Sequence, residues 1–203
     1  MSHAARLALS ATLFAACFVA SAQDSAVSPR VTRYEAPGNL QPTHTLECID
    51  PDKILNTYTP ADLYPAVASC IVQSRTDDAI YLYVVAGAYG QYDTLRVADK
   101  SAHDAPMLLR MHAFNPIGIE RMQQFNSQVL PFLQDDAKHL DLCYKLLHLG
   151  PPRYFPRYMT QHGMSAFMKS DAPDQVQDID PVTNWLQIMK DYVHCDVALP
   201  KSD

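Results

Sequence analysis

Glycine is scarce in this chain. Only six of the 203 residues are glycine, and none of them belongs to a glycine-rich phosphate-binding loop. The sequence also has no C-x-x-C pair and no histidine–cysteine spacing typical of zinc ligands, so a zinc site is the less favoured use of its cysteines. No carboxylates have the spacing of a recognisable catalytic pair. No segment alternates apolar and polar residues long enough to predict a strand. We therefore predict an all-α protein without a cofactor or a metal site.

Residues 1–22 have the composition of an export signal. Arg6 supplies the positive start, residues 7–19 form an apolar run, and residues 20–22 (Ala-Ser-Ala) resemble a cleavage site before Gln23. The apolar run is too short for a permanent membrane-spanning helix. A lipoprotein attached through Cys17 is the alternative, but Phe14 fits poorly at the first position of a lipid-attachment box. We expect a periplasmic or secreted protein.

Four cysteines remain after the expected cleavage, and an even number in an exported chain predicts disulfides. They allow three pairings. We favour Cys48–Cys70 and Cys143–Cys195, because Cys70 and Cys143 lie on apolar helix faces whereas Cys48 and Cys195 lie just outside helix ends. These pairs would fasten an entry segment and a terminal helix to the rest of the molecule.

The charge balance is mildly acidic. Removing Arg6 from the 16 basic residues leaves 15 against 22 acidic residues, a net charge of −7. An acidic surface argues against binding to nucleic acid or to anionic membranes, and it permits a basic partner.

The chain is organised around residues 59–99, which predict two apolar helices joined by a short polar turn. Apolar residues recur at helical spacing from Leu63 to Ile71, and Pro65 suggests that the regular helix starts near Asp62. Asp77 or Asp78 is expected to cap the second helix, which is apolar on all sides between residues 80 and 89 and should therefore be central. No second copy of this pair follows at a fixed period.

Further helices are expected to pack against this pair. The start and stop signals place them at 105–114 after Asp104, from 117 to a stop at Pro131, from Asp135 or Asp136 to Gly150, at 156–168, and from Asp180-Pro181 to Cys195. Asp50-Pro51-Asp52 opens a short helix. We predict a flexible leader at 23–43 and a single helical domain at 44–203, a compact multi-helix bundle with two disulfides.

Two polar blocks contain the residue types that chemistry needs. The candidate polar cluster is Arg96, Asp99, Lys100, His103, Tyr158 and His162. In a small periplasmic hydrolase, Asp99 would orient His103 for acid–base catalysis while Arg96 and Lys100 hold an anion, and His162 is the alternative to His103. The structural interpretation is favoured, because Asp99 and His103 should fall in the linker between helices, where they would form caps and ion pairs.

The second block offers no firmer catalytic set. Tyr158 and His162 are four residues apart and would share a helix face, where a buried tyrosine–histidine hydrogen bond is expected. Ser165 lacks the following glycine that a nucleophile elbow requires. We therefore assign no catalytic residue.

The blocks YGQYDTLRVADKSAHDA and C-x6-GPPRYFPRYMTQHGMSAF, within residues 55–168, resemble those of a recurring group of small exported bacterial proteins. The resemblance implies a helical domain and assigns no catalytic residue. More loosely, the chain is similar to periplasmic immunity proteins that neutralise antibacterial effectors. The leading hypothesis is a non-enzymatic binding protein whose partner is another protein, with no nucleic acid and no integral membrane span. A small hydrolase and a structural accessory of an envelope or secretion complex are the alternatives.

Overall fold

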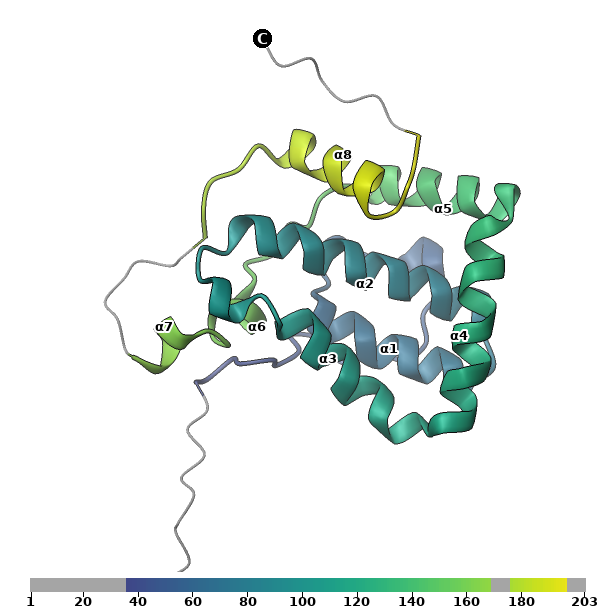
Figure 1. Ribbon diagram of the computed structural model, residues 1–203, viewed down its shortest axis with the longest axis horizontal. Coiled ribbons are helices and arrows are strands. Elements are labelled where there is room, and N and C mark those ends of the chain that lie inside the picture. Colours follow the sequence, from purple (N-terminus) through teal and green to yellow (C-terminus); the bar gives the residue numbers. More distant parts are fainter. Residues whose placement is uncertain (1–35, 169–175, 197–203) are drawn as a thin grey trace, which may run out of the picture. The chain divides into compact units, whose positions relative to one another are not determined.

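The computed structural model describes residues 36–168 and 176–196, and within them it is all-α, as the sequence predicts (Figure 1). The eight α-helices are α1 (Pro60–Val72), α2 (Thr76–Arg96), α3 (Ala105–Phe114), α4 (Ile119–Gln134), α5 (Asp136–Leu149), α6 (Arg157–Thr160), α7 (Met164–Phe167) and α8 (Pro181–Asp191). Three 3₁₀ turns complete the described elements: η1 (Pro51–Lys53), η2 (Lys100–Ala102) and η3 (Asn115–Ile117). The only β-type pairing among the described residues is an isolated bridge between Val97 and Val176.

Helices α1 and α2 form the central hairpin, and α3, α4 and α8 pack against it (Figure 1). Thr59 and Asp62 make a reciprocal capping box at the start of α1. This cap starts the helix at Pro60, two residues before the predicted start, and Pro65 is tolerated inside it. Asp62 is fully buried and also accepts hydrogen bonds from the backbone amides of Thr43 and His44. Residues upstream of the predicted domain start at 44 are therefore bound to α1.

Helix α2 contributes a long, almost continuous buried run from Ala79 to Asp93. The prediction that Asp77 or Asp78 caps it is wrong: Arg75 occupies the cap position, and both aspartates lie in the first turn. In the first turn their negative charges interact favourably with the positive end of the helix dipole, but neither side chain makes a capping hydrogen bond. Gly87 and Gly90 leave room for the close approach of the Tyr192 and Pro106 side chains, respectively, because a Cβ at either position would collide with them.

The remaining helices follow the predicted order, with differences at their ends. Helix α3 has the predicted bounds, but Asp104 makes no side-chain cap there. Helix α4 continues through the predicted stop at Pro131 to Gln134. Asp135 caps the start of α5, and Gly150 is the cap residue just after its last residue, Leu149. The predicted helix at 156–168 is instead two short helices, α6 and α7, separated by residues 161–163. Helix α8 ends at Asp191, so Cys195 lies in the segment beyond it.

Both predicted disulfides are confirmed. Cys48–Cys70 joins the entry segment to α1, and Cys143–Cys195 joins α5 to the segment after α8. Such bonds fit an oxidising compartment outside the cytoplasm. No helix in the described part of the chain is long and apolar enough to cross a membrane. The predicted signal peptide and Cys17 lie outside the described residues.

Candidate functional site

The predicted polar cluster separates into several small hydrogen-bonded groups. Asp99 caps η2 by accepting from the backbone and hydroxyl of Ser101, and it also accepts from the backbone of Ser165 at 3.0 Å. Partial burial alone would raise the pKa of Asp99, but the hydrogen bonds from Ser101 and Ser165 outweigh burial and lower the pKa to about 2. Gly163 is needed beside this carboxylate, because a Cβ there would overlap Asp99. Asp99 therefore fastens η2 to α7.

The two histidines of the cluster are each engaged elsewhere. His103 Nε2 donates to the carbonyl of Val97 at 2.8 Å, so Asp99 does not orient it. His162 lies between Asn39 and Asp104, with ring nitrogens 2.8 and 3.1 Å from their side-chain oxygens. The expected hydrogen bond between Tyr158 and His162 is absent, since the interruption between α6 and α7 removes the shared helix face. Lys100 is exposed.

Arg96 and Tyr158 instead meet at a buried carboxylate that sequence analysis did not single out. Asp93 Oδ1 lies 2.6 and 2.8 Å from two Arg96 nitrogens, and Oδ2 accepts from the hydroxyls of Tyr158 and Tyr154 at 2.7 and 2.8 Å. The guanidinium lies over the rings of Tyr92 and Tyr154, 5.4 and 5.1 Å from their centroids. Asp93 has no exposed surface. The group joins α2 to the segment around α6.

The electrostatics of this group indicate a structural role. Burial raises the pKa of Asp93, while the Arg96 charge and the hydrogen bonds from Tyr158 and Tyr154 oppose the rise. Burial also raises the pKa of both tyrosines, so their hydroxyls remain donors. A substrate cannot reach a carboxylate without exposed surface. Apart from the exposed Lys100, the residues of the predicted cluster thus form caps, hydrogen bonds and ion pairs at separate places in the described structure.

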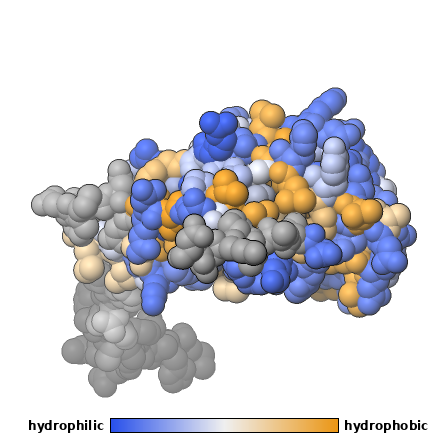
Figure 2. Space-filling view, turned by 90° about the horizontal axis from the view of Figure 1, so that it is seen from above, coloured by the Kyte–Doolittle hydropathy of each residue, from blue (hydrophilic) through white to orange (hydrophobic). Residues whose placement is uncertain are grey.

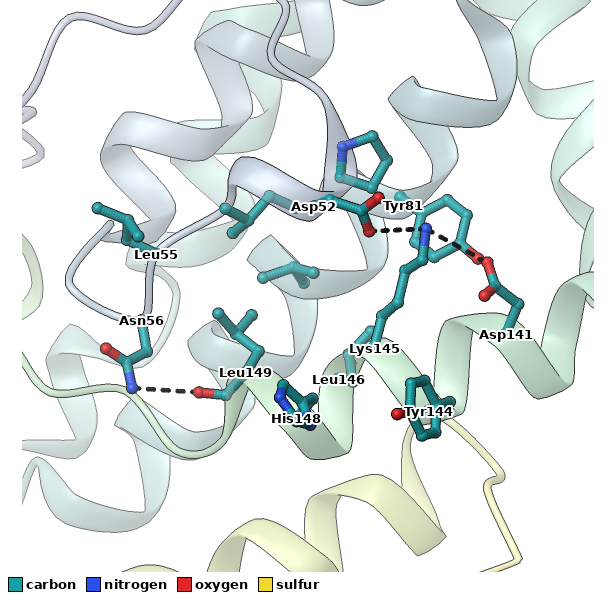
Figure 3. Close-up of a pocket in the computed structure, with 13 residues that line it drawn as sticks. Asp52, Leu55, Asn56, Tyr81, Asp141, Tyr144, Lys145, Leu146, His148 and Leu149 are labelled. Atoms are coloured by element: carbon teal, nitrogen blue, oxygen red, sulfur yellow. Dashed lines mark hydrogen bonds and ion pairs between the residues drawn. The ribbon is translucent and has the colours of Figure 1, made fainter.

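A groove lies between η1, α2 and α5 (Figure 3). Its volume is about 410 Å³. Lys145 of α5 lies 2.9 Å from Asp52 and 3.5 Å from Asp141, and its ammonium is 5.1 Å from the centroid of the Tyr81 ring. The Tyr81 hydroxyl donates to Asp141. Leu55 forms part of the apolar lining and is 52% exposed.

Tyr81 and Lys145 of this groove are binding groups rather than bases. Burial, followed by the hydrogen bond to Asp141, raises the pKa of Tyr81, so its hydroxyl holds its proton. The ion pair with Asp52 raises the pKa of Lys145, which keeps the amine charged. Neither group can act as a base at neutral pH; His148 and the carboxylates of Asp52 and Asp141 also line the groove.

The outer face of α5 borders this groove and carries apolar side chains in water. Leu140 is 71% exposed, Tyr144 66% and Leu147 40%, and their spacing of four and three residues places them on one stripe. Leu142, Cys143 and Leu146 form the buried face of the same helix. Figure 2 looks onto the side of the molecule where α5 and α8 lie and shows hydrophobic side chains among polar ones there. We call Leu140, Tyr144 and Leu147 the α5 outer stripe.

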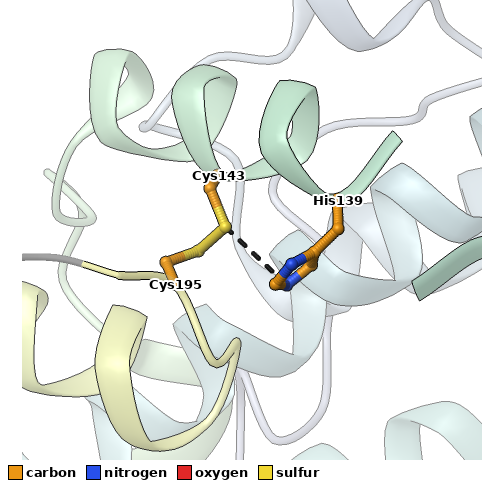
Figure 4. A group of neighbouring side chains, drawn as sticks. All are labelled: His139, Cys143 and Cys195. Atoms are coloured by element: carbon orange, nitrogen blue, oxygen red, sulfur yellow. Dashed lines mark hydrogen bonds between the residues drawn. A yellow bond between two sulfur atoms is a disulfide. The ribbon is translucent and has the colours of Figure 1, made fainter. Parts of the chain in front are cut away.

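One group of side chains has metal-ligand character, but it is committed to a disulfide (Figure 4). The ligand atoms of His139, Cys143 and Cys195 lie within 4.8 Å of one another. Sulfurs joined to each other are poor ligands, because metals bind the thiolate. His139 Nε2 donates to the carbonyl of Val193 at 2.9 Å and lies 3.7 Å from the Cys143 sulfur. Only a reduced form would offer the Cys₂His set that zinc accepts.

Comparisons with protein-family models, curated protein sequences and solved structures find no match to this chain. The resemblance to small exported bacterial proteins stays a prediction, and the site must be interpreted from its own geometry.

The sequence carries only weak signals for the functional residues that were not predicted from it. Asp93 and Arg96 are three residues apart, and Asp141 and Lys145 are four apart, both of which are ion-pair spacings on a helix. The outer stripe was visible as apolar residues on two faces of the helix at 136–149. Pairs that join distant segments, such as Tyr158 to Asp93, had no local signal.

Proposed function

We propose that this protein is a periplasmic or secreted binding protein without enzymatic activity, and that it acts as an immunity protein against an antibacterial effector. The observation that carries the proposal is the α5 outer stripe. A helix already packed on one face gains nothing for folding from three large apolar side chains exposed on the other. Such residues are typical of interaction surfaces, where aromatic anchors contribute much of the binding energy.

The groove beside the stripe supports a basic partner. Asp52 and Asp141 are both largely exposed, with 71% and 52% of their side-chain surface accessible, so a partner's lysine or arginine can reach them. The stripe supplies apolar contact, and the aspartates supply charge complementarity at its edge. The net charge of −7 expected for the mature chain acts in the same direction.

The absence of a convergent catalytic set favours binding over the hydrolase alternative. His103 and His162 bond to different parts of the fold, and Arg96 is paired with a buried carboxylate. No observation singles out the third hypothesis, an envelope accessory.

The test is affinity purification of the tagged protein from the periplasm, followed by identification of the captured protein and its expression in that compartment. We expect the captured protein to be toxic, and toxicity to be suppressed by the native chain. Tyr144→Arg should weaken complex formation at least tenfold, because it removes the central aromatic and adds a charge that a basic partner repels.

Ile119→Arg is the matched control. Ile119 is 78% exposed at the start of α4 and outside the groove, so the same change there should leave binding unaltered. Equal binding by the native chain and Tyr144→Arg would refute the assignment of the surface. A captured protein that is not toxic would refute the immunity role.

A further inference from the structure

A second site is suggested by four proton-donating side chains that meet beside α2. Arg110 of α3 donates from Nη1 to the hydroxyl of Tyr83 at 3.1 Å, and the ring of Tyr64 on α1 contacts the Tyr83 ring edge-on with centroids 6.4 Å apart. Tyr192, just after α8, places its hydroxyl against Gly87. Tyr83 and Gly87 are four residues apart and share a face of α2, so all four groups gather on that face.

The group has donors to spare and lacks acceptors. The Tyr83 hydroxyl accepts from Arg110, which leaves its own proton free. Tyr64 is only 4% exposed, yet its hydroxyl and that of Tyr192 make no hydrogen bond within the residues that the structure describes. Arg110 has no carboxylate within ion-pair distance in the same part of the chain. Tyr192 is 39% exposed and Arg110 is exposed too, so these donors can be reached by an acceptor that arrives from outside.

The hydroxyls remain protonated at neutral pH. Burial raises the pKa of Tyr64, and the neighbouring Tyr192 and Tyr83 hydroxyls raise it further, against the opposing charge of Arg110. Burial and Tyr83 also raise the pKa of Tyr192. The guanidinium is charged as well, so the group presents a single positive charge surrounded by hydroxyl donors.

An apolar pocket of about 470 Å³ adjoins this group and shares Tyr83 and Tyr192 with it. The rest of its wall combines aliphatic side chains, such as Val84 from α2 and Leu130 and Leu133 from α4, with Gln134, His139 and His194. This volume lies in the range of small-molecule sites, and an apolar wall with a few convergent polar groups is their usual composition.

We propose that this pocket binds an amphipathic monocarboxylate, with its hydrocarbon chain between α2 and α4 and its carboxylate on Arg110 and the tyrosine hydroxyls. A carboxylate matches the geometry of the guanidinium and supplies the missing acceptors. One cation in an acidic protein favours a single negative charge over a polyanion. The pocket is separate from the α5 outer stripe, so it adds a ligand to the proposed protein-binding role and does not depend on that role.

Titration calorimetry on the full oxidised chain tests the proposal, with decanoate as the probe and decanol and acetate as comparisons. We expect decanoate to bind at least tenfold more tightly than either one. Arg110→Met should remove the preference for decanoate over decanol. The fold should be kept, because Arg110 is exposed and the methionine side chain replaces its apolar stem. Arg121→Met, at an exposed arginine of α4, is the matched control and should bind decanoate as the native chain does.

Val129→Trp separates the tail site from the carboxylate site. The larger side chain should fill the pocket and abolish binding of both ten-carbon ligands. Three results would each overturn the proposal: no decanoate binding by the native chain, an unchanged decanoate preference in Arg110→Met, or acetate binding as tightly as decanoate.

Discussion

Arg96 shows how a residue type common in active sites is used here to hold the fold together. Its partner Asp93 has no exposed surface and accepts hydrogen bonds from two tyrosines besides Arg96. A buried ion pair stabilises little against an apolar replacement of both members, but the loss of one member is costly because the other charge stays buried.

Replacing Arg96 by Met should therefore lower the free energy of unfolding by about 3–5 kcal/mol, the range for an uncompensated buried charge. Urea denaturation followed by circular dichroism measures the change. The double variant Asp93→Leu/Arg96→Met should recover a large part of the loss, because no buried charge remains. If Arg96→Met were as stable as the native chain, the pair would not be structural.

Asp99 gives a prediction of pH dependence. Its folded-state pKa, about 2, is lower than the ordinary value of 3.8, so the carboxylate stabilises the fold fully above about pH 4 and loses this contribution as the pH falls through about 2. The stability difference between the native chain and Asp99→Asn should be present at pH 6 and shrink towards pH 2. Urea denaturation at several pH values measures it. A difference that grows on acidification would contradict the assignment.

At the scale of elements, each disulfide joins one end of the described chain to a helix: Cys48 of the entry segment to α1, and Cys195 after α8 to α5. Cys195 follows α8, a helix of eleven residues, and its bond to Cys143 holds the end of that segment on α5. A crosslink stabilises chiefly by restricting the unfolded chain, and more so for a longer loop. The bonds span 52 residues for Cys143–Cys195 and 22 for Cys48–Cys70.

Removing each bond by paired serine substitutions should therefore have graded effects. Loop-closure entropy predicts a loss of about 4 kcal/mol for Cys143→Ser/Cys195→Ser and about 3 kcal/mol for Cys48→Ser/Cys70→Ser. Limited proteolysis should cut first near α8 in the former and in the entry segment in the latter. Thermal denaturation and mass mapping of the cuts measure both effects. Cleavage at the same sites in both variants would contradict the assignment of each bond to its own segment.

At the scale of the whole molecule, net charge governs encounter with a partner more than it governs the fold. The net charge of −7 expected for the mature chain would attract the proposed basic partner over distances comparable to the Debye length, which is about 10 Å at 0.1 M salt. The α5 outer stripe supplies apolar contact that salt hardly weakens.

The association rate with the partner should thus fall at least tenfold between 0.05 and 0.5 M salt, while the dissociation rate changes by much less. Surface plasmon resonance measures both rates. Asp52→Asn/Asp141→Asn should flatten the salt dependence, and the distant control Asp178→Asn, at an exposed residue, should leave it steep. A rate independent of salt would contradict charge-guided binding.

Local pattern alone determined much of this protein. Apolar periodicity, caps and proline positions gave the helical class and the order of the helices, because these signals act over one or two turns. The position of each cysteine relative to a helix end was enough to favour the correct pairing. The helix boundaries could be predicted less closely than the helices themselves. Pro65 and Pro131 remain inside helices, because packing and, at the start of α1, the capping box offset the hydrogen bond that each proline lacks.

Only the tertiary structure decided what the polar residues do. The sequence placed Arg96, Asp99 and His103 close together along the chain, but their roles also depend on segments that folding brings near: Ser165 donates to Asp99, and Tyr158 donates to the Asp93 that pairs with Arg96. The groove and the group around Tyr83 likewise combine residues from separate helices. Backbone hydrogen bonding is local and therefore legible in the sequence, whereas these sites are set by how helices pack, which depends on the whole chain at once.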